Sequence, residues 1–153
     1  MIQSFAPIRQ IHMHLCGFAF YKDDPKRQVE LHHFTAALND DVFQCAVYDG
    51  EGAKARLVGI EYVISEKLFN TLDADEKKYW HSHMYDIKSG SFIAPRIPNA
   101  IDHTLAQDLA LTYGKTWILW QTDRGDRLPI GEPKLMMVAT KDGEWDPKLF
   151  ERR

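Results

Sequence analysis

The sequence predicts an α+β fold, a single domain built on a mainly antiparallel β-sheet with a few short helices. Extended segments with alternating apolar and polar residues are joined by links of hairpin length, and the helical patterns are short and separate from them. With 153 residues the chain can form one domain that buries roughly two thirds of its unfolded surface. We therefore interpret residues 1–153 as one domain, with a loose arm at residues 1–9 and a polar tail at residues 141–153.

Seven segments are predicted to be strands because β-branched and aromatic residues are concentrated in them and turn-forming residues separate them. Segment 24–38 carries two patterns. Asp24-Pro25 is typical of a helix start, but the alternation from Val29 to Thr35 favours a strand, which we prefer. The predicted strands are, in chain order, residues 10–21, 24–38, 42–48, 55–65, 81–85, 116–122 and 135–140.

Three short helices are predicted from residues that can cap a helix N-terminus. Ser65 can cap a short helix, and Asp73 with Glu76 resembles a capping box that opens a helical turn ending near Trp80. A third helix is predicted from a second capping box and a glycine that would terminate it. Its residues are Thr104 and Gln107 at the start, Leu105, Leu109 and Tyr113 along one side, and Gly114 at the end.

The composition excludes several classes of protein. A net charge of −3 gives no basic surface for nucleic acid, so we expect no nucleic-acid partner. Apolar runs of about seven residues are far shorter than the ~20 that cross a bilayer, so no transmembrane segment is expected. The N-terminus lacks the pattern of an export signal, and two cysteines do not indicate a disulfide scaffold. We expect a soluble, cytoplasmic protein; the oligomeric state stays open, a homo-oligomer included.

The histidines are the main indication of function, because six of the seven fall into three close pairs. Imidazole is a common ligand of transition metals and titrates near neutral pH. His81 and His83 share a face if residues 81–85 form a strand, so both rings could bind one ion. Asp86 would then point the other way and be a poor third ligand. Alternatively, the two histidines lie at a helix C-terminus and offset its dipole.

The other two pairs are weaker indications. His14 and Cys16 share one strand face with His12 and could bind zinc or copper, but we favour a cysteine buried for packing beside a partly exposed histidine. His32 and His33 are adjacent and diverge, so only one can face a given site, and we choose His33.

Glu61 lies opposite the apolar face of its predicted strand. We take it as a candidate general base or carboxylate ligand, or alternatively as a solvated residue on the outer face of the sheet.

Many ordered motifs between about residues 14 and 140 resemble the oil body-associated protein family, which includes plant seed proteins of lipid bodies and has fungal and bacterial members. The resemblance implies association with lipid bodies, and it implies no reaction. The family commonly has Glu where this chain has Asp86, and plant members often carry longer N-terminal extensions. The motifs are His14-Leu15-Cys16-Gly17-Phe18, Arg27-Gln28-Val29-Glu30, His32-His33, Leu38-Asn39, Gln44-Cys45, Tyr48-Asp49, residues 55–62, Ser65-Glu66, Trp80-His81-Ser82-His83, Lys88-Ser89-Gly90, Tyr113-Gly114-Lys115 and Trp120-Gln121 followed by Asp123-Arg124-Gly125-Asp126.

Taken together, the sequence predicts a histidine-rich, metal-binding protein. His14, His33, His81 and His83 are the expected ligands of a divalent transition metal (zinc, iron or copper), with Glu61 as a candidate catalytic base. Such a site could belong to a metal-dependent hydrolase or oxidoreductase acting on a small hydrophobic or oxidised molecule.

Two alternatives need no metal. A non-catalytic protein peripheral to lipid bodies, or one that binds a partner, would expose an aromatic patch that includes Phe18, Phe20 and Phe92. An organic-ligand pocket would instead be lined by Trp117, Trp120 and Tyr85. A lipid surface as partner would thus require an exposed aromatic patch, whereas a small-molecule partner would require a pocket.

Overall fold

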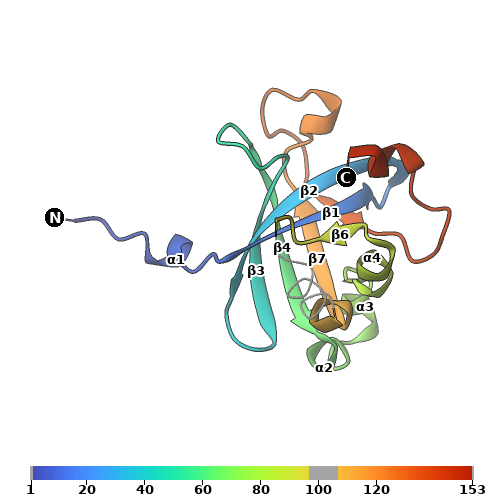
Figure 1. Ribbon diagram of the computed structural model, residues 1–153, viewed down its shortest axis with the longest axis horizontal. Coiled ribbons are helices and arrows are strands. Elements are labelled where there is room, and N and C mark those ends of the chain that lie inside the picture. The colour runs from blue at the N-terminus through green and yellow to red at the C-terminus, as the bar shows by residue number, and fades with distance from the viewer. Residues whose placement is uncertain (1, 97–106, 153) are drawn as a thin grey trace.

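Six antiparallel strands close into a barrel in the computed structural model, which describes residues 2–96 and 107–152 (Figure 1). The order is β2-β3-β4-β7-β8-β1, and the pairing of β1 with β2 closes the ring. The predicted α+β class, with its mainly antiparallel sheet, is confirmed. The strands are β1 (Met13–Tyr21), β2 (Asp24–Ala37), β3 (Val42–Tyr48), β4 (Leu57–Ser65), β7 (Thr112–Ile118) and β8 (Lys134–Met137).

Short elements cover one side of the barrel. Two-residue strands, β5 (His81–Ser82) and β6 (Phe92–Ile93), pair with β7 and β1 respectively. Four-residue helices α1, α2 and α3 and the six-residue α4 lie outside the sheet, and α1 belongs to an arm that extends away from the barrel (Figure 1). The helices are α1 (Ala6–Arg9), α2 (Glu66–Phe69), α3 (Ala74–Lys77) and α4 (Met84–Ser89), with 3₁₀ segments at Thr122–Arg124 and Pro147–Arg152.

The capping predictions are confirmed at two helices. The Ser65 hydroxyl accepts a hydrogen bond from the Leu68 amide, and the Asp73 carboxylate accepts one from the Glu76 amide at 2.8 Å. Segment 24–38 is a strand, as preferred. The capping predictions were correct because the hydrogen bond of a cap involves only residues of the first helical turn.

The predicted helix that ends at Gly114 is wrong in its second half. Its start, with Thr104 and Leu105, lies outside the described residues. The helical residues that follow are 107–110, whereas Tyr113 and Gly114 lie within β7. Gly114 pairs with Val63 of β4 on one side and with His81 of β5 on the other. The glycine is therefore a strand residue at a close approach and not a helix terminator.

The predicted strand 81–85 is also shorter than expected. Only His81 and Ser82 are in β5, and the chain turns at His83, which is the N-cap of α4. Asp86 consequently lies in the first turn of α4 and is buried. Two other strands have shifted limits: the predicted 116–122 is Thr112–Ile118, and the predicted 135–140 is Lys134–Met137.

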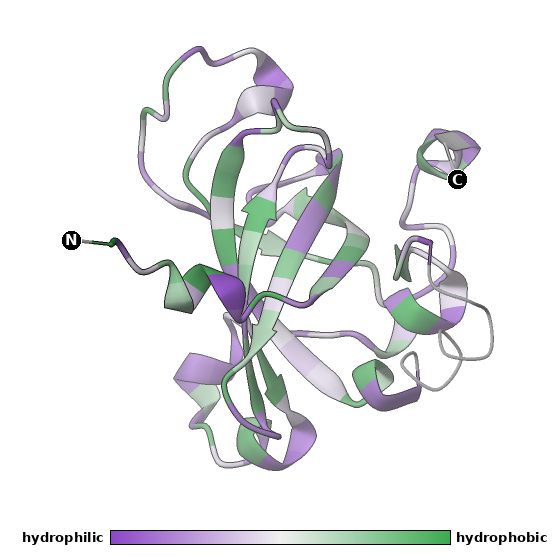
Figure 2. Ribbon diagram, turned by 60° about the vertical axis from the view of Figure 1, so that its left-hand side comes forward, coloured by the Kyte–Doolittle hydropathy of each residue, from purple (hydrophilic) through white to green (hydrophobic). Residues whose placement is uncertain are grey.

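Strand register divides the side chains between the barrel interior and its outer surface. Directly paired residues share a face, so the pairs Leu15–His33, His33–Val47 and Glu61–Thr116 place all five of these side chains inside. Figure 2 shows hydrophilic and hydrophobic residues alternating along these strands. The main apolar cluster fills the rest of the interior and packs beneath the C-terminal segment; it comprises Phe18, Ala19, Tyr21, Leu31, Val47, Val58, Ile118, Met136, Val138, Ala139 and Trp145.

Candidate metal centre

Four predicted site residues meet inside the barrel. His33 comes from β2, Glu61 from β4, His81 from β5, and His83 from the turn before α4. We call these four residues the inner cluster. The Nε2 atoms of His33 and His81 lie 3.4 and 3.8 Å from Glu61 Oε1, and His83 Nε2 lies 3.6 Å from Glu61 Oε2. All four side chains are at most 5% exposed.

These distances match the edges of a metal coordination shell. Two ligand atoms at about 2.1 Å from one ion and at a tetrahedral angle lie about 3.4 Å apart. The Glu61, His81 and His83 ligand atoms all lie within 4.8 Å of one another. Glu61, His81 and His83 are therefore spaced for a shared ion, and His33 contacts the same carboxylate at 3.4 Å.

His83 is held by two contacts to the same residue of β7. Its amide donates to the Thr112 carbonyl at 3.1 Å, and its Nδ1 lies 2.8 Å from the Thr112 hydroxyl. That hydroxyl donates its proton to the Leu109 carbonyl, so it can only accept from the ring. The proton of neutral His83 therefore lies on Nδ1, and the Nε2 lone pair points toward the Glu61 carboxylate. Neither His83 Nε2 nor Glu61 Oε2 has a hydrogen-bond partner in the described part of the chain.

Gly114 leaves the space that an ion would need. A Cβ atom at this position would lie 2.9 Å from both His81 Nε2 and His83 Nε2, and 3.0 Å from Glu61 Oε2. Three candidate ligand atoms thus surround one point beside the β7 backbone. Every residue other than glycine would place its Cβ atom there.

The protonation states suit a cation. Burial by itself would raise the pKa of Glu61, but the imidazoles of His33, His83 and His81 lower it well below its usual value. Burial lowers the pKa of His81 to about 3, although Glu61 opposes the change. Near neutral pH the structure thus presents a carboxylate and at least one neutral imidazole to the same point, and Thr116 donates a hydrogen bond to Glu61 Oε1.

The space around the inner cluster is small and closed by apolar side chains. Its cavity has a volume of about 10 Å³, which holds roughly one water molecule. Phe92 stacks on the His83 ring at 5.2 Å between centroids and also contacts His33. Gly17 makes room for Phe92, since a Cβ there would collide with the ring. An organic substrate does not fit in this conformation.

His14 does not join the inner cluster. It pairs with Phe34, so strand parity places it on the outer surface, where its Nε2 lies 2.8 Å from His32 Nδ1. His32 Nε2 lies 3.2 Å from Glu30 Oε1 and 4.0 Å from Cys16 Sγ, while His14 Nδ1 lies 3.7 Å from Glu51. We call Cys16, Glu30, His32, His14 and Glu51 the outer cluster. The two weaker histidine pairs thus contribute His33 to the inner cluster and His14 and His32 to the outer cluster, while His12 is exposed and belongs to neither.

Sequence reasoning missed the residues that support the inner cluster. Thr112, Gly114 and Thr116 all come from β7, and the incorrect helix end at Gly114 concealed this strand. Asp86, interpreted as facing away, lines the same small cavity from α4, and its carboxylate accepts a hydrogen bond from Ser91. In the structure, buried residues alternate strictly from Thr112 to Ile118, as is typical of a strand.

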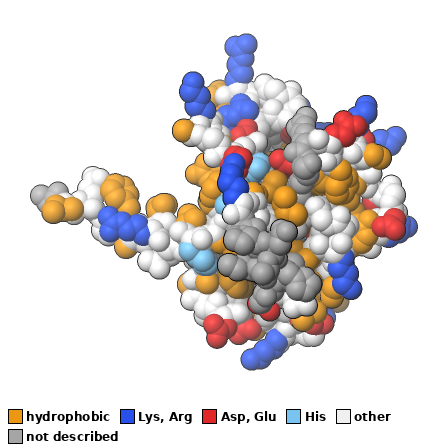
Figure 3. All heavy atoms as spheres, in the orientation of Figure 1, with side chains coloured by type: hydrophobic (Ala, Val, Ile, Leu, Met, Phe, Trp, Pro, Cys, Tyr) orange, Lys and Arg blue, Asp and Glu red, His pale blue; other side chains and the backbone are white. Residues whose placement is uncertain are grey.

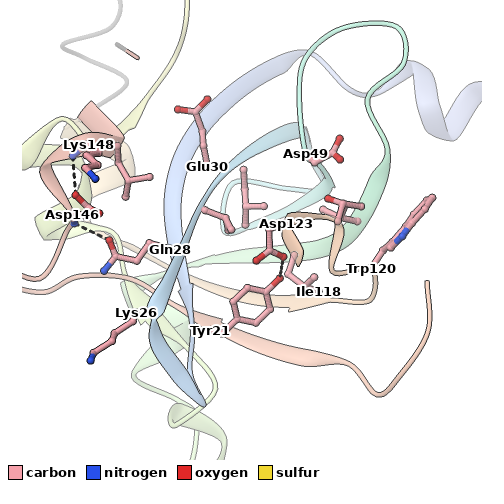
Figure 4. A pocket seen from close by; sticks show the side chains of 15 residues that line it. Tyr21, Lys26, Gln28, Glu30, Asp49, Ile118, Trp120, Asp123, Asp146 and Lys148 are labelled. Atoms are coloured by element: carbon pink, nitrogen blue, oxygen red, sulfur yellow. Dashed lines mark hydrogen bonds between the residues drawn. The ribbon is translucent and has the colours of Figure 1, made fainter. Parts of the chain in front are cut away.

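A larger cavity of about 500 Å³ lies elsewhere, between β2, the end of β7 and the C-terminal segment. Figure 4 shows the Tyr21 hydroxyl directed at Asp123, to which it donates a hydrogen bond at 2.7 Å. Of the three aromatic residues expected around an organic ligand, Trp120 lines this cavity, whereas Trp117 and Tyr85 do not. The cavity is separate from the four inner-cluster residues, none of which lines it.

The aromatic patch expected from Phe18, Phe20 and Phe92 is not exposed. Phe18 is 1% and Phe92 6% exposed, and Phe20 packs partly buried against the core. The outer surface instead carries an apolar row across neighbouring strands, in which Phe34, Ala46, Ile60 and Trp117 are paired in turn. No helix within residues 2–96 and 107–152 has the length and apolar character needed to cross a bilayer.

Comparison with known proteins places the chain in a family. Oil body-associated protein 1B of Arabidopsis thaliana is 52% identical over 143 residues, which cover 94% of this chain and 59% of that protein. Oil body-associated protein 2A of the same plant is 49% identical over 155 residues, covering 100% and 63%. The chain thus spans less than two thirds of these relatives' length. No solved structure matches. The family model described as "Protein of unknown function (DUF1264)" matches residues 5–153, and the chain belongs to this family, which confirms the resemblance drawn from its motifs.

Proposed function

We propose that the protein binds one divalent transition metal ion inside the barrel, through His33, His81, His83 and Glu61. The observation that carries the proposal is the convergence of ligand atoms of Glu61, His81 and His83 within 4.8 Å of one another, beside Gly114. In the neutral form of His83, Thr112 takes the Nδ1 proton and the Nε2 lone pair faces a carboxylate oxygen 3.6 Å away. Two buried acceptors that face each other are unfavourable, and a cation between them removes the conflict.

The ligand set limits the identity of the ion. Three imidazoles and one carboxylate suit zinc, iron or copper. We place zinc first, because the distances of 3.4 to 3.8 Å from the three histidine nitrogens to the Glu61 oxygens are close to ligand separations in a tetrahedral site. In this proposal Glu61 is a ligand and not the general base expected from the sequence. A base works best with a pKa near the working pH, and that of Glu61 is well below its usual value.

The size of the cavity restricts the chemistry of the ion. About 10 Å³ admits a water molecule, or a molecule of similar size such as dioxygen, as a further ligand. A metal ion in this position would polarise that small molecule. A hydrolase or oxidoreductase with a larger hydrophobic substrate would need Phe92 and its neighbours to move away from the inner cluster.

Elemental analysis of protein purified without a histidine tag tests the proposal. We expect about one equivalent of metal in the inner cluster, and its loss in His81→Ala and in His83→Ala. His12→Ala is the matched control, because His12 is exposed and its ring contacts the Gln10 carbonyl at 3.2 Å, outside the inner cluster. Equal metal content in His83→Ala and His12→Ala, measured on folded protein, would refute the inner site.

A second candidate function is association with a lipid surface. The names of the relatives describe oil body association, and the apolar row on the outer surface gives a physical basis for it in this chain. Near this row Leu57, Ile60 and Tyr62 are between 40 and 53% exposed. Exposed apolar side chains that lie together are typical of interaction sites.

Flotation with phospholipid-coated triacylglycerol droplets tests this candidate. We expect the protein to float with the droplets, and the double variant Ile60→Ser/Tyr62→Ser to stay in the aqueous fraction. Leu128→Ser, which alters an exposed leucine in the segment between β7 and β8, is the control. Flotation of both variants to the same extent would show that the apolar row is not the contact surface.

A further inference from the structure

We infer that the outer cluster is a second metal site, independent of the inner one, in which Cys16, Glu30 and His32 bind a thiol-preferring cation of the zinc class. The three ligand atoms lie within 4.8 Å of one another. Zinc bound to sulfur at about 2.3 Å and to nitrogen at about 2.05 Å separates these two atoms by about 3.6 Å at a tetrahedral angle. The Cys16 Sγ–His32 Nε2 distance of 4.0 Å needs to shorten by only a few tenths.

The hydrogen bonds of the two rings are compatible with a cation on His32 Nε2. His32 Nε2 lies 3.2 Å from Glu30 Oε1, and His32 Nδ1 lies 2.8 Å from His14 Nε2. Two neutral imidazoles carry two N–H groups, which is enough for these two contacts in the metal-free protein. A metal ion bound to His32 Nε2 would take the place of the proton that this nitrogen directs at Glu30.

A cation on His32 Nε2 would leave both rings with partners. His32 then donates its Nδ1 proton to His14 Nε2, and His14 directs its Nδ1 proton at Glu51. Histidine ligands commonly donate their second ring nitrogen to such a partner. Arg96 completes the chain, because its guanidinium donates two hydrogen bonds to Glu51, at 2.7 and 2.9 Å. His14 and Glu51 are therefore positioning residues, and Cys16 would release its thiol proton to solvent when the metal–sulfur bond forms.

The environment of the outer cluster favours capture of an ion from solution. The Glu30 side chain is 24% exposed and that of Glu51 40%, so one side of the cluster is open. Figure 3 shows histidine atoms beside acidic and basic side chains on this face of the molecule. Cys16 and His32 are buried beneath them. A water molecule from the open side can complete a four-coordinate shell.

Cobalt(II) titration tests the inference because cobalt substitutes for zinc and a cobalt–thiolate bond gives a charge-transfer absorption band. The wild-type protein is expected to bind two equivalents, one of them with the band. Cys16→Ser should lose the band and one equivalent. Cys45→Ser is the matched control, since Cys45 is an equally buried thiol that accepts a hydrogen bond from Thr35 at 3.3 Å.

The outcomes separate this site from the inner one. His83→Ala should keep the thiolate band while losing the other equivalent. Glu51→Gln should keep the band but weaken cobalt binding by roughly 10- to 100-fold, the usual effect of a residue that orients a ligand. A band that is absent in the wild type, or that is lost equally in Cys16→Ser and Cys45→Ser, would overturn the inference. In either case, the loss of one cobalt equivalent in His83→Ala would still support the inner site.

Discussion

His32 and His33 are neighbours in the chain, yet they belong to two clusters with different properties. His33 points into the barrel and meets Glu61, His81 and His83 in a closed space, whereas His32 points outward and meets His14, Glu30 and Cys16. Both clusters combine imidazole with carboxylate. The comparison teaches that strand parity and burial, not residue type, separate a rigid buried site from a partly open one.

Support from surrounding residues also differs between the clusters. In the inner cluster Thr112 fixes the tautomer of His83, and Thr116 donates to Glu61. In the outer cluster the rings of His14 and His32 hydrogen-bond to each other, and which ring donates depends on their tautomers. We therefore expect a chelator to remove metal from the outer cluster faster than from the inner one, since only the outer one has a solvent-exposed carboxylate.

Gly114→Ala should have the largest effect and should act on the inner cluster alone. The new methyl group would lie 2.9 Å from two histidine nitrogens and take the space of the ion, so inner metal should be lost. Overpacking should also lower the free energy of unfolding by about 1–3 kcal/mol. Metal content and urea denaturation measure both effects. Gly52→Ala is the control, because its Cβ would meet nothing within 4 Å.

Thr112→Val should weaken inner metal binding by roughly 10- to 100-fold, because the variant keeps the shape of threonine but cannot accept the His83 Nδ1 proton. Competition with a chromophoric chelator measures the affinity. Thr71→Val, at an exposed hydroxyl that donates to the Leu68 carbonyl, should leave the affinity unchanged. Equal affinities for the two variants would mean that the tautomer of His83 is not fixed by Thr112.

Acid should destabilise the metal-free protein through the inner cluster. The unfolded chain protonates His81 below its ordinary pKa of 6.5, whereas the folded protein does so only near a pKa of about 3. The unfolded state binds more protons between these values, so stability falls as pH falls, by at most about 1.4 kcal/mol per pH unit from this group. Urea denaturation across this range should show a shallower fall for His81→Leu than for His12→Ala. Identical slopes would contradict the burial of a neutral His81.

Phe34→Leu should have the smallest effect and should act on the outer cluster alone. The Phe34 ring stacks on His14 with centroids 4.7 Å apart, and loss of the stack should cost about 0.5–1.5 kcal/mol of stability. Thermal denaturation measures this change. Inner metal content should be that of the wild type, and a fall in it would show that the two faces of β2 are coupled.

The two clusters also show which features could be predicted from the sequence and which could not. Val42–Tyr48 was predicted with its observed limits, and Ser65 and Asp73 were identified as caps, because alternation and capping are local properties. His33, chosen over His32, lies inside the barrel and contacts Glu61. His14, predicted as a ligand of the same site, lies on the outer face, where it pairs with Phe34 of β2.

By itself the sequence determined the fold class, the family and the residue types that can bind a metal, because these follow from periodicity, motif order and side-chain chemistry. The tertiary structure decided which histidines meet. The pairing of β4 with β7 places Glu61 opposite Thr116, and β5 adds His81 beside Gly114. The candidate ligands lie on strands that are distant in the chain. Only the pairing of these strands sets the nitrogen–oxygen distances of a few ångströms that metal binding requires.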